Sequence, residues 1–268
     1  LEYAYSWYDF AQAAKNDHYY DPASGTYKGG FVINAEGEKE AIKGRSSFIM
    51  KKKVKVYPDT LCWLKDLTYA YNEPFVREYF SHIGYDNYPV VGVNWHQAQA
   101  FCNWRTQYFN SNAGVRVQAW RLPNEVEWEY AARGGLSGAK YPWGGPYTRN
   151  KKGCFLANFK PLRGNYISDG GFTYEPNGFG LYDMAGNVAE WTGDAFDESA
   201  YQVTHDLSPY YQITAKKSDN KILKRKVIRG GSWKDIAYFM QCGVRTYEYA
   251  DSARSFIGFR TVRTRIEY

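Results

Sequence analysis

Thiols are the most reactive side chains in this sequence, and there are four of them. Cys62, Cys102, Cys154 and Cys242 lie far apart and form neither a C-x-x-C pair nor a zinc-type spacing, so a metal–thiolate centre is not indicated. An even number permits two disulfides in an oxidising compartment, but the spacing does not decide the pairing. Because most of their neighbours in the sequence favour burial, we expect buried free thiols.

A lone Cys242 would need a neighbouring base to act as a nucleophile. The nearest histidine in the sequence is His205, and the histidines as a set form no cluster. Arg121, Glu127 and Arg133 are the other ionisable candidates, but in a loop-rich core such groups more often pair with one another and tie loops together. We therefore interpret these three residues as structural.

Two helices are predicted to position this central region. They cover residues 94 to 109 and 124 to 133, where apolar residues recur at steps of three and four. Each helix begins with an asparagine followed three residues later by glutamine or glutamate, which is the pattern of a capping box. Gly134-Gly135 ends the second helix.

Downstream of Tyr141, glycine, proline, asparagine and aspartate alternate with aromatic residues, which predicts turns and excludes long helices. Short strands are expected at residues 53 to 57, 226 to 229 and 258 to 262. Aromatic residues supply 19% of the chain, and large rings fill the space between irregular segments. These features predict an α+β fold with few regular elements.

The chain of 268 residues carries 34 basic against 28 acidic residues, a net charge of +6. Both signs are spread along the sequence, so nucleic acid is not an indicated partner. No apolar run approaches the roughly 18 residues that span a bilayer. We expect a single domain over residues 1 to 268, with excursions at residues 34 to 80 and 197 to 226.

Five motifs lie in one order along about two thirds of the chain. They are RLPNEVEWEYAARGG, YPWGG, PNGFGLYDMAGNVAEWTGD, RGGSW and IGFR. Together they closely resemble the formylglycine-generating enzyme family, also called sulfatase-modifying factor domains. The resemblance implies a compact, C-type-lectin-like, loop-rich α+β fold. It also implies that the start of the fold lies upstream of residue 1.

In the enzymes of that family, two cysteines that follow the GGS[YW] motif bind a copper ion. The matching segment here reads GGSWKDIAYFMQCGVRT, with Asp235 where the first cysteine is expected and Cys242 displaced from the second. One misplaced thiol cannot reproduce a two-thiolate copper site. The resemblance therefore implies no copper, no catalytic residues and no enzymatic activity.

The family often binds calcium through loop oxygens. The matching positions are Asn158, the Phe159 carbonyl, Asp169 and the Gly171 carbonyl, and a second site would use Asn187 and Glu190. Hard oxygen donors on glycine-rich loops suit calcium, although asparagine and aspartate in turns usually bond to their own backbone. The resemblance implies calcium at one or both sites.

A narrower resemblance is carried by VYPDTLCWLKDLTYAYNEPF, YDNYPVVGVNWHQAQAFCNWRT and GCFLANFKPLRGNY. These segments are similar to the GldK/PorK lipoproteins of the type IX secretion and gliding machinery, with the related GldJ proteins as the nearest competitor. The resemblance implies a non-catalytic periplasmic ring with a GldN/PorN-type partner and an outer-membrane protein of the same machinery. It also implies anchoring to the inner face of the outer membrane by an upstream lipidated cysteine.

Two other functions remain alternatives: an active formylglycine-generating or related oxidase with relocated ligands, and a lectin-like ligand-binding module. If the protein has no chemistry, its function must reside on its surfaces, and long polar excursions are where contact residues concentrate. The aromatic candidates for partner contacts in the two excursions are Trp63, Tyr69, Tyr71, Tyr210 and Tyr211.

Overall fold

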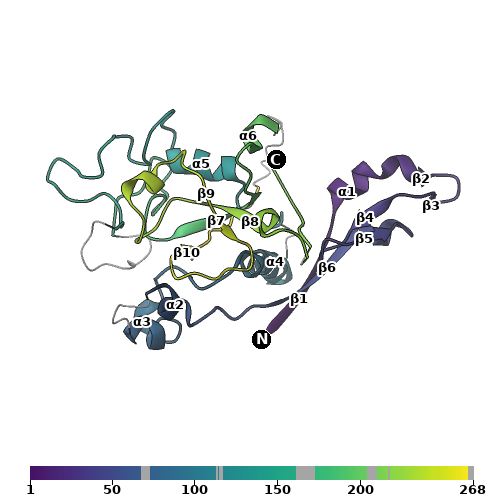
Figure 1. Cartoon of the computed structure of the whole chain (residues 1–268), viewed down its shortest axis with the longest axis horizontal. Helices are drawn as coiled ribbons and strands as arrows, with labels where there is room; N and C mark the ends of the chain where they lie inside the picture. The colour runs from purple at the N-terminus through teal and green to yellow at the C-terminus, as the bar shows by residue number, and fades with distance from the viewer. Residues whose placement is uncertain are drawn as a thin grey trace.

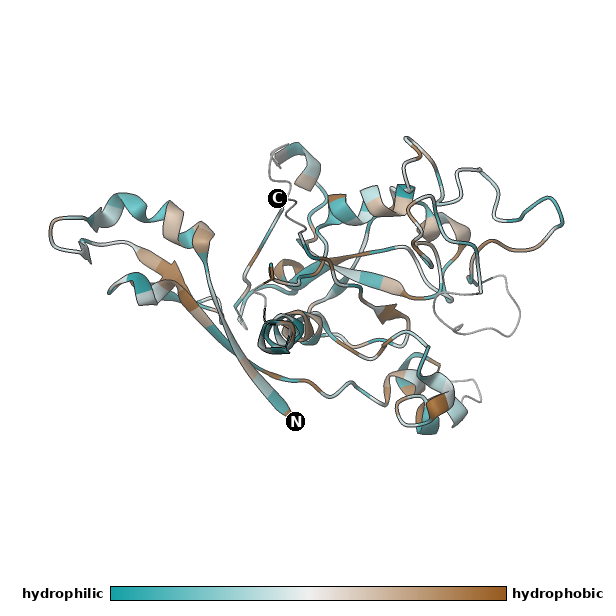
Figure 2. Cartoon of the chain, turned by 180° about the vertical axis from the view of Figure 1, so that it is seen from behind, coloured by the Kyte–Doolittle hydropathy of each residue, from teal (hydrophilic) through white to brown (hydrophobic). Residues whose placement is uncertain are grey.

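A computed structural model gives the architecture. It describes residues 1–67, 73–112, 114, 117–160, 173–203, 210–216 and 218–264. Residues 1–55 form an extended arm, and the other described residues form a body beside it (Figure 1). Hydrophobic segments occur in both parts, in the arm and in the centre of the body (Figure 2).

The arm is built on a two-stranded antiparallel ribbon. Strand β1 (Glu2–Tyr8) pairs with β6 (Ile49–Lys55), with Glu2 opposite Lys55 and Tyr8 opposite Ile49. A small core of Val32, Ile42, Phe48 and Met50 holds the arm together. The elements between the two strands are α1 (Phe10–Lys15), β2 (Tyr20–Asp21), β3 (Thr26–Tyr27), β4 (Phe31–Ile33) and β5 (Lys39–Ala41).

The expected strand at residues 53 to 57 is confirmed only in part, because β6 starts at Ile49. The three lysines of its basic run alternate between the two faces of the strand: Lys51 and Lys53 are exposed, while Lys52 is half-buried. The base of the ribbon packs on the body through Tyr5 and Val54, which contact Ala100.

A four-stranded sheet in the order β10-β7-β8-β9 forms the centre of the body. Strands β7, β8 and β9 are antiparallel, and β10 runs parallel to β7. The expected strand at 226 to 229 is confirmed, whereas the one at 258 to 262 reduces to β10 and an isolated bridge between Val262 and Arg121. The strands are β7 (Ala189–Ala195), β8 (Arg225–Arg229), β9 (Thr246–Tyr249) and β10 (Ile257–Gly258).

Both predicted helices are confirmed. The helix α4 (Trp95–Asn112) begins with a capping box, in which the Gln97 backbone N–H donates to Asn94 Oδ1 at 3.0 Å and the Asn94 N–H donates to Gln97 Oε1 at 2.8 Å. The helix α5 (Glu125–Arg133) has the same box at its start and ends at Gly134, whose φ of 56° is left-handed.

The two helices pack on opposite faces of β7. Trp191 points into the cluster that contains Ala98 and Cys102 of α4, whereas Glu190 accepts a hydrogen bond from Trp128 of α5. Adjacent residues of a strand point to opposite faces of the sheet. In the described part of the chain the other helices are short: α2 (Cys62–Asp66), α3 (Glu73–Glu78) and α6 (Ala200–Val203).

The fold is thus α+β and rich in loops, as the sequence predicts. Among the described residues, no helix downstream of Tyr141 exceeds the four residues of α6. None of the helices in those residues combines the length and the apolar character needed to cross a membrane.

Candidate functional site

The segment that follows RGGSW folds as a tight turn around Asp235. The Asp235 carboxylate accepts a hydrogen bond from Ser232 Oγ at 2.6 Å, and its backbone carbonyl accepts one from the Lys160 N–H at 2.9 Å. Gly231, with φ of 66°, lies so close to Phe239 and Met240 that a Cβ could not fit. Asp235 therefore serves as a residue that closes a turn.

Cys242 is a packing residue. Its side chain is 1% exposed and lies in a cluster with Trp128, Ala132 and Met184. Burial raises the pKa of the Cys242 thiol to about 11, so the thiol stays protonated at neutral pH. A protonated thiol is a poor nucleophile, because the thiolate is the reactive form.

The four cysteines are all free. Burial also raises the pKa values of Cys62 and Cys102 to about 12. Cys154 differs from the expectation of burial, because it lies exposed in the turn that follows Asn150.

The three ionisable residues considered above are in ion pairs. Arg121 makes a two-fold hydrogen-bonded pair with Glu127, at 2.5 Å for both bonds. Arg133 donates to Glu129 Oε1 from Nε at 3.0 Å and from Nη2 at 2.6 Å. The first pair joins the loop before α5 to its first turn, whereas the second lies within α5, and Arg133 Nη1 also donates to the Ala139 carbonyl of the following loop at 2.7 Å. These contacts agree with the structural interpretation.

A buried charge cluster at the base of α5 was not predicted. The Arg229 guanidinium is 0% exposed and donates to Glu125 Oε1 at 2.9 Å, to Glu129 Oε2 at 2.5 Å and to the Cys242 carbonyl. Arg245 donates to both oxygens of Glu125, at 2.6 and 2.8 Å. Two arginines thus compensate two carboxylates in the interior.

Asn158 fits the role of a calcium ligand. The residue is 1% exposed, and neither its side-chain oxygen nor its side-chain nitrogen has a hydrogen-bond partner. Buried amides are almost always bonded, so an unpartnered amide oxygen indicates a missing ion or water. Phe159 is buried beside it. Asp169 and Gly171 lie outside the described residues.

The two residues of the second expected calcium site have other partners. The Glu190 carboxylate accepts hydrogen bonds from Trp128 Nε1 at 2.7 Å and from Arg260 Nε and Nη2 at 2.5 and 2.6 Å. An arginine already neutralises it, so Glu190 is an ion-pair residue. Asn187 is a turn residue with φ of 61° that donates to Asp183 Oδ2 at 3.1 Å. Among the described residues, no group of three or more His, Cys, Asp or Glu is arranged to hold a metal.

Of the candidate partner contacts, Trp63 is wrong. It is 0% exposed and stacks on Trp233 with ring centroids 6.0 Å apart, inside the main hydrophobic core. Tyr69 and Tyr71 lie outside the described residues. Tyr210 is 41% exposed, and Tyr211 is half-buried, with its N–H donating to Asp194 at 2.9 Å.

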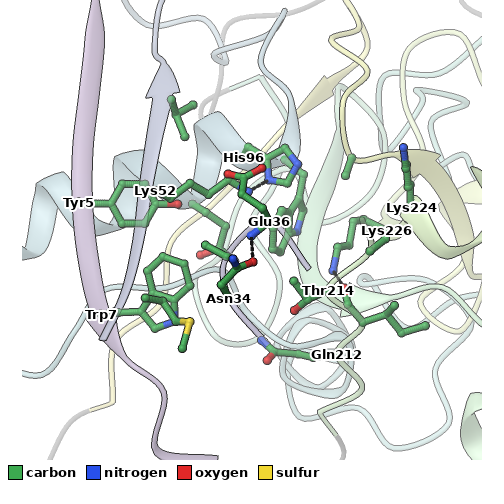
Figure 3. A pocket seen from close by; sticks show the side chains of 18 of the residues that line it. Tyr5, Trp7, Asn34, Glu36, Lys52, His96, Gln212, Thr214, Lys224 and Lys226 are labelled. Atoms are coloured by element: carbon green, nitrogen blue, oxygen red, sulfur yellow. Dashed lines mark hydrogen bonds between the residues drawn. The ribbon is translucent and has the colours of Figure 1, made fainter. Parts of the chain in front are cut away.

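A cavity of about 620 Å³ separates the arm from the body, with Tyr210 at its margin. Its walls are β1, β6 and residues 33–36 of the arm, the start of α4, residues 212–216, and the outer part of β8. Figure 3 shows its polar lining, with Lys52 beside His96. Local sequence patterns do not indicate this cavity, because its walls come from segments far apart in the sequence.

Comparison with known proteins agrees with this fold. The sulfatase-modifying factor enzyme 1-like domain model matches residues 28–265. The formylglycine-generating enzyme of Streptomyces coelicolor is 34% identical over 66% of this chain and 53% of its own length. The inactive C-alpha-formylglycine-generating enzyme 2 of Bos taurus is 34% identical over 65% of this chain and 49% of its own. The match thus spans about half the length of these relatives.

Two solved structures share the fold. Treponema denticola variable protein 1 superposes with a TM-score of 0.51 at 27% identity, over 66% of this chain and 71% of that one. PvdO from Pseudomonas aeruginosa superposes with a TM-score of 0.53 at 25% identity, over 66% and 62%. With a family model that covers most of its residues, the chain belongs to the sulfatase-modifying factor enzyme 1-like domain family.

Proposed function

We propose that this protein is a non-catalytic member of the family that acts as a structural subunit. The observation that carries the proposal is the turn at Asp235 together with the enclosed thiol of Cys242. Copper-dependent oxidation in this family uses two thiolates at that position. Here Asp235, whose carboxylate closes a turn, stands where the first thiolate is expected, and Cys242, which is displaced from the second position, is held protonated by burial.

The specific assembly that we propose is the type IX secretion and gliding machinery, in which the chain forms a periplasmic ring with a GldN/PorN-type partner under the outer membrane. The segments at residues 56–75, 85–106 and 153–166 support this proposal by their resemblance to GldK/PorK lipoproteins. A bovine relative described as inactive supports the first part, because it indicates that the fold persists in the family without the reaction.

The test combines an activity assay with an assembly assay. We expect the purified protein, loaded with copper, to leave a C-x-P-x-R peptide unoxidised in mass spectrometry. Co-expression with a GldN/PorN-type partner should give a stable complex, with rings in electron micrographs. Cys242→Ser should change neither result, because the thiol only packs, and should cost about 1–3 kcal/mol of stability, since it places a hydroxyl in an apolar cluster.

Formylglycine produced at enzyme-like rates would show that the protein is catalytic. Failure to bind the partner with the peptide left intact would keep the non-catalytic function and reject the secretion assembly.

We also propose calcium at Asn158, with the Phe159 carbonyl as a neighbouring donor. When bound, calcium would cross-link loop oxygens and supply a counter-charge without chemistry of its own. The support is the unpartnered, buried Asn158 amide. Asp169 and Gly171 belong to this proposal through the family resemblance alone.

Calcium removal should therefore destabilise the protein. A ligand that binds only the folded state at about 100 times its Kd stabilises that state by about 2.7 kcal/mol. We expect a chelator to lower the Tm by several degrees and Asn158→Ala to abolish that response.

Asn177→Ala is the matched control, because Asn177 is also buried but its amide is fully hydrogen-bonded to backbone groups of residues 131, 132, 179 and 181. That variant should be less stable yet keep its response to chelator. Identical melting curves for the wild type with and without chelator would remove calcium from the proposal.

A further inference from the structure

The cavity between arm and body contains a buried lysine that has no carboxylate partner. Lys226 is 5% exposed. Its ammonium lies 4.2 Å from the centre of the Trp95 ring and 3.4 Å from the Ile213 carbonyl. Within the described residues, no carboxylate lies inside the 4.0 Å ion-pair distance of this group. Burying a cation is costly unless it is paired.

A second lysine reaches the same cavity from the arm. The Lys52 ammonium lies 2.9 Å from His96 Nδ1. An ammonium can only donate, so Nδ1 accepts and the ring proton is on Nε2, which faces Asp251 Oδ1 at 3.4 Å. Burial lowers the pKa of His96, which keeps the ring neutral. Neutral His96 therefore solvates the Lys52 charge without cancelling it.

The rest of the cavity lining also carries a net positive charge. More lysines than carboxylates line the cavity, with Asp9, Glu36 and Asp251 as the acidic members. The first residues of α4 also line it, and the start of a helix carries partial positive charge. Asp251 is occupied by His96, and the pKa of Lys52 is lowered because its burial outweighs the attraction of Glu36 and Asp251.

The shape of the site indicates the kind of anion. The cavity of about 620 Å³ is many times larger than one phosphate or carboxylate, and ligand sites of this size take a molecule of several residues. Its walls also contain the rings of Tyr5, Trp7, Trp95 and Trp120. Aromatic walls with a few convergent charges suit a chain that carries both acidic and apolar side chains.

We propose that this cavity binds an acidic peptide segment of a partner protein, with a carboxylate at Lys52 and Lys226 and a neighbouring apolar side chain against the aromatic walls. Two lysines of separate elements, β6 of the arm and β8 of the body, then hold one ligand (Figure 3). The ligand would also join arm and body, which already touch where Gly37, with φ of +83°, fits closely over the Lys216 backbone.

The test uses a fluorescein-labelled hexapeptide of alternating leucine and glutamate, followed by fluorescence polarisation with the full chain. We expect Lys52→Met and Lys226→Met each to weaken binding at least about tenfold, since truncating one partner of a buried charge pair is costly. Lys51→Met is the matched control, because it removes the same charge one residue away, on an exposed position outside the cavity. It should change the affinity by less than about twofold.

Two further probes separate peptide recognition from other anion binding. The same peptide with glutamine in place of glutamate should not bind. Inorganic phosphate should displace no more of the acidic peptide than chloride does at the same ionic strength. Three results would each overturn the proposal. They are an equal loss of affinity in Lys51→Met and the two cavity variants, binding of the glutamine peptide, and displacement of the acidic peptide by phosphate beyond that by chloride. Lys52 is only half-buried, so its variant keeps the test decisive if Lys226→Met misfolds.

Discussion

Arg229→Met is expected to destabilise the protein by about 3–5 kcal/mol, which is the cost of removing one partner of a buried ion pair. The change deletes the hydrogen bonds to Glu125, Glu129 and the Cys242 carbonyl. Arg245 still holds Glu125, but Glu129 keeps only Arg133 and the carbonyl is left without its donor. Because small domains are stable by only about 5–15 kcal/mol, much of the total stability is at stake.

Urea denaturation followed by tryptophan fluorescence measures this loss. Arg77→Met is the matched control, since Arg77 pairs with Glu73 on an exposed helix surface, with 74% of the arginine side chain accessible. An exposed pair four residues apart contributes about 0.3–0.5 kcal/mol. If both variants lost similarly small amounts of stability, the Arg229 cluster would not be a structural centre of the body.

Lys226→Met, unlike Arg229→Met, is expected to stabilise the protein, by on the order of 2 kcal/mol at pH 7. Burial, with the nearby Lys52 charge acting in the same direction and Asp194 opposing, lowers the pKa of Lys226 to about 8. Its unfolded value is about 10.4. The folded protein therefore holds a charge in a place that disfavours it, and methionine keeps an unbranched apolar side chain, shorter only by the charged group.

The pH dependence identifies the cause. Below pH 8 the lysine is charged in both states, so the full cost is present. Between pH 8 and about 10.4 the folded state releases the proton first, the unfolded state binds more protons, and the stability of the wild type rises. The difference between wild type and Lys226→Met should shrink over this range in urea denaturation. Burial raises the pKa values of Tyr5 and Tyr210 to about 12, and their contribution to the pH dependence is common to both proteins and cancels in the difference.

A constant difference from pH 7 to 10, or a destabilised variant at pH 7, would contradict this prediction. The same substitution is expected to weaken binding of the acidic peptide. Lys226 would then lower the stability of the folded protein and strengthen ligand binding. Such a combination is expected at a ligand site, since functional residues often reduce stability.

The elements that could be predicted from the sequence are those specified by neighbours in the chain. Both capping boxes lie within four residues, so the starts of α4 and α5 were predicted correctly. Strand β1 was missed, although Tyr3, Tyr5 and Trp7 alternate with smaller or polar residues in the way of a half-buried strand. Attention to that alternation would have found it.

The rest depends on contacts between distant segments. Glu125 and Arg229 are 104 positions apart, and nothing near either residue indicates the pair. Trp63 lies in the excursion at residues 34 to 80, which made it a candidate for partner contacts, but its partner Trp233 comes from the other end of the chain. The cavity has the same origin: Lys52 and Lys226 belong to two short basic runs of the sequence, but they form a site with His96 only when arm and body meet.

The register of the ribbon makes residues 9–48 an excursion whose two ends meet. Tyr8 and Ile49 are opposite each other, so the chain leaves and re-enters the ribbon at the same point. Whatever lies between them can lengthen, shorten or be exchanged during evolution without moving α4 or the central sheet, because loop length affects closure entropy only slowly. The sequence of the body can thus remain constrained by its packing. The sequence of the outer arm, which includes the cavity wall at residues 33–36, is free to change when the partner changes.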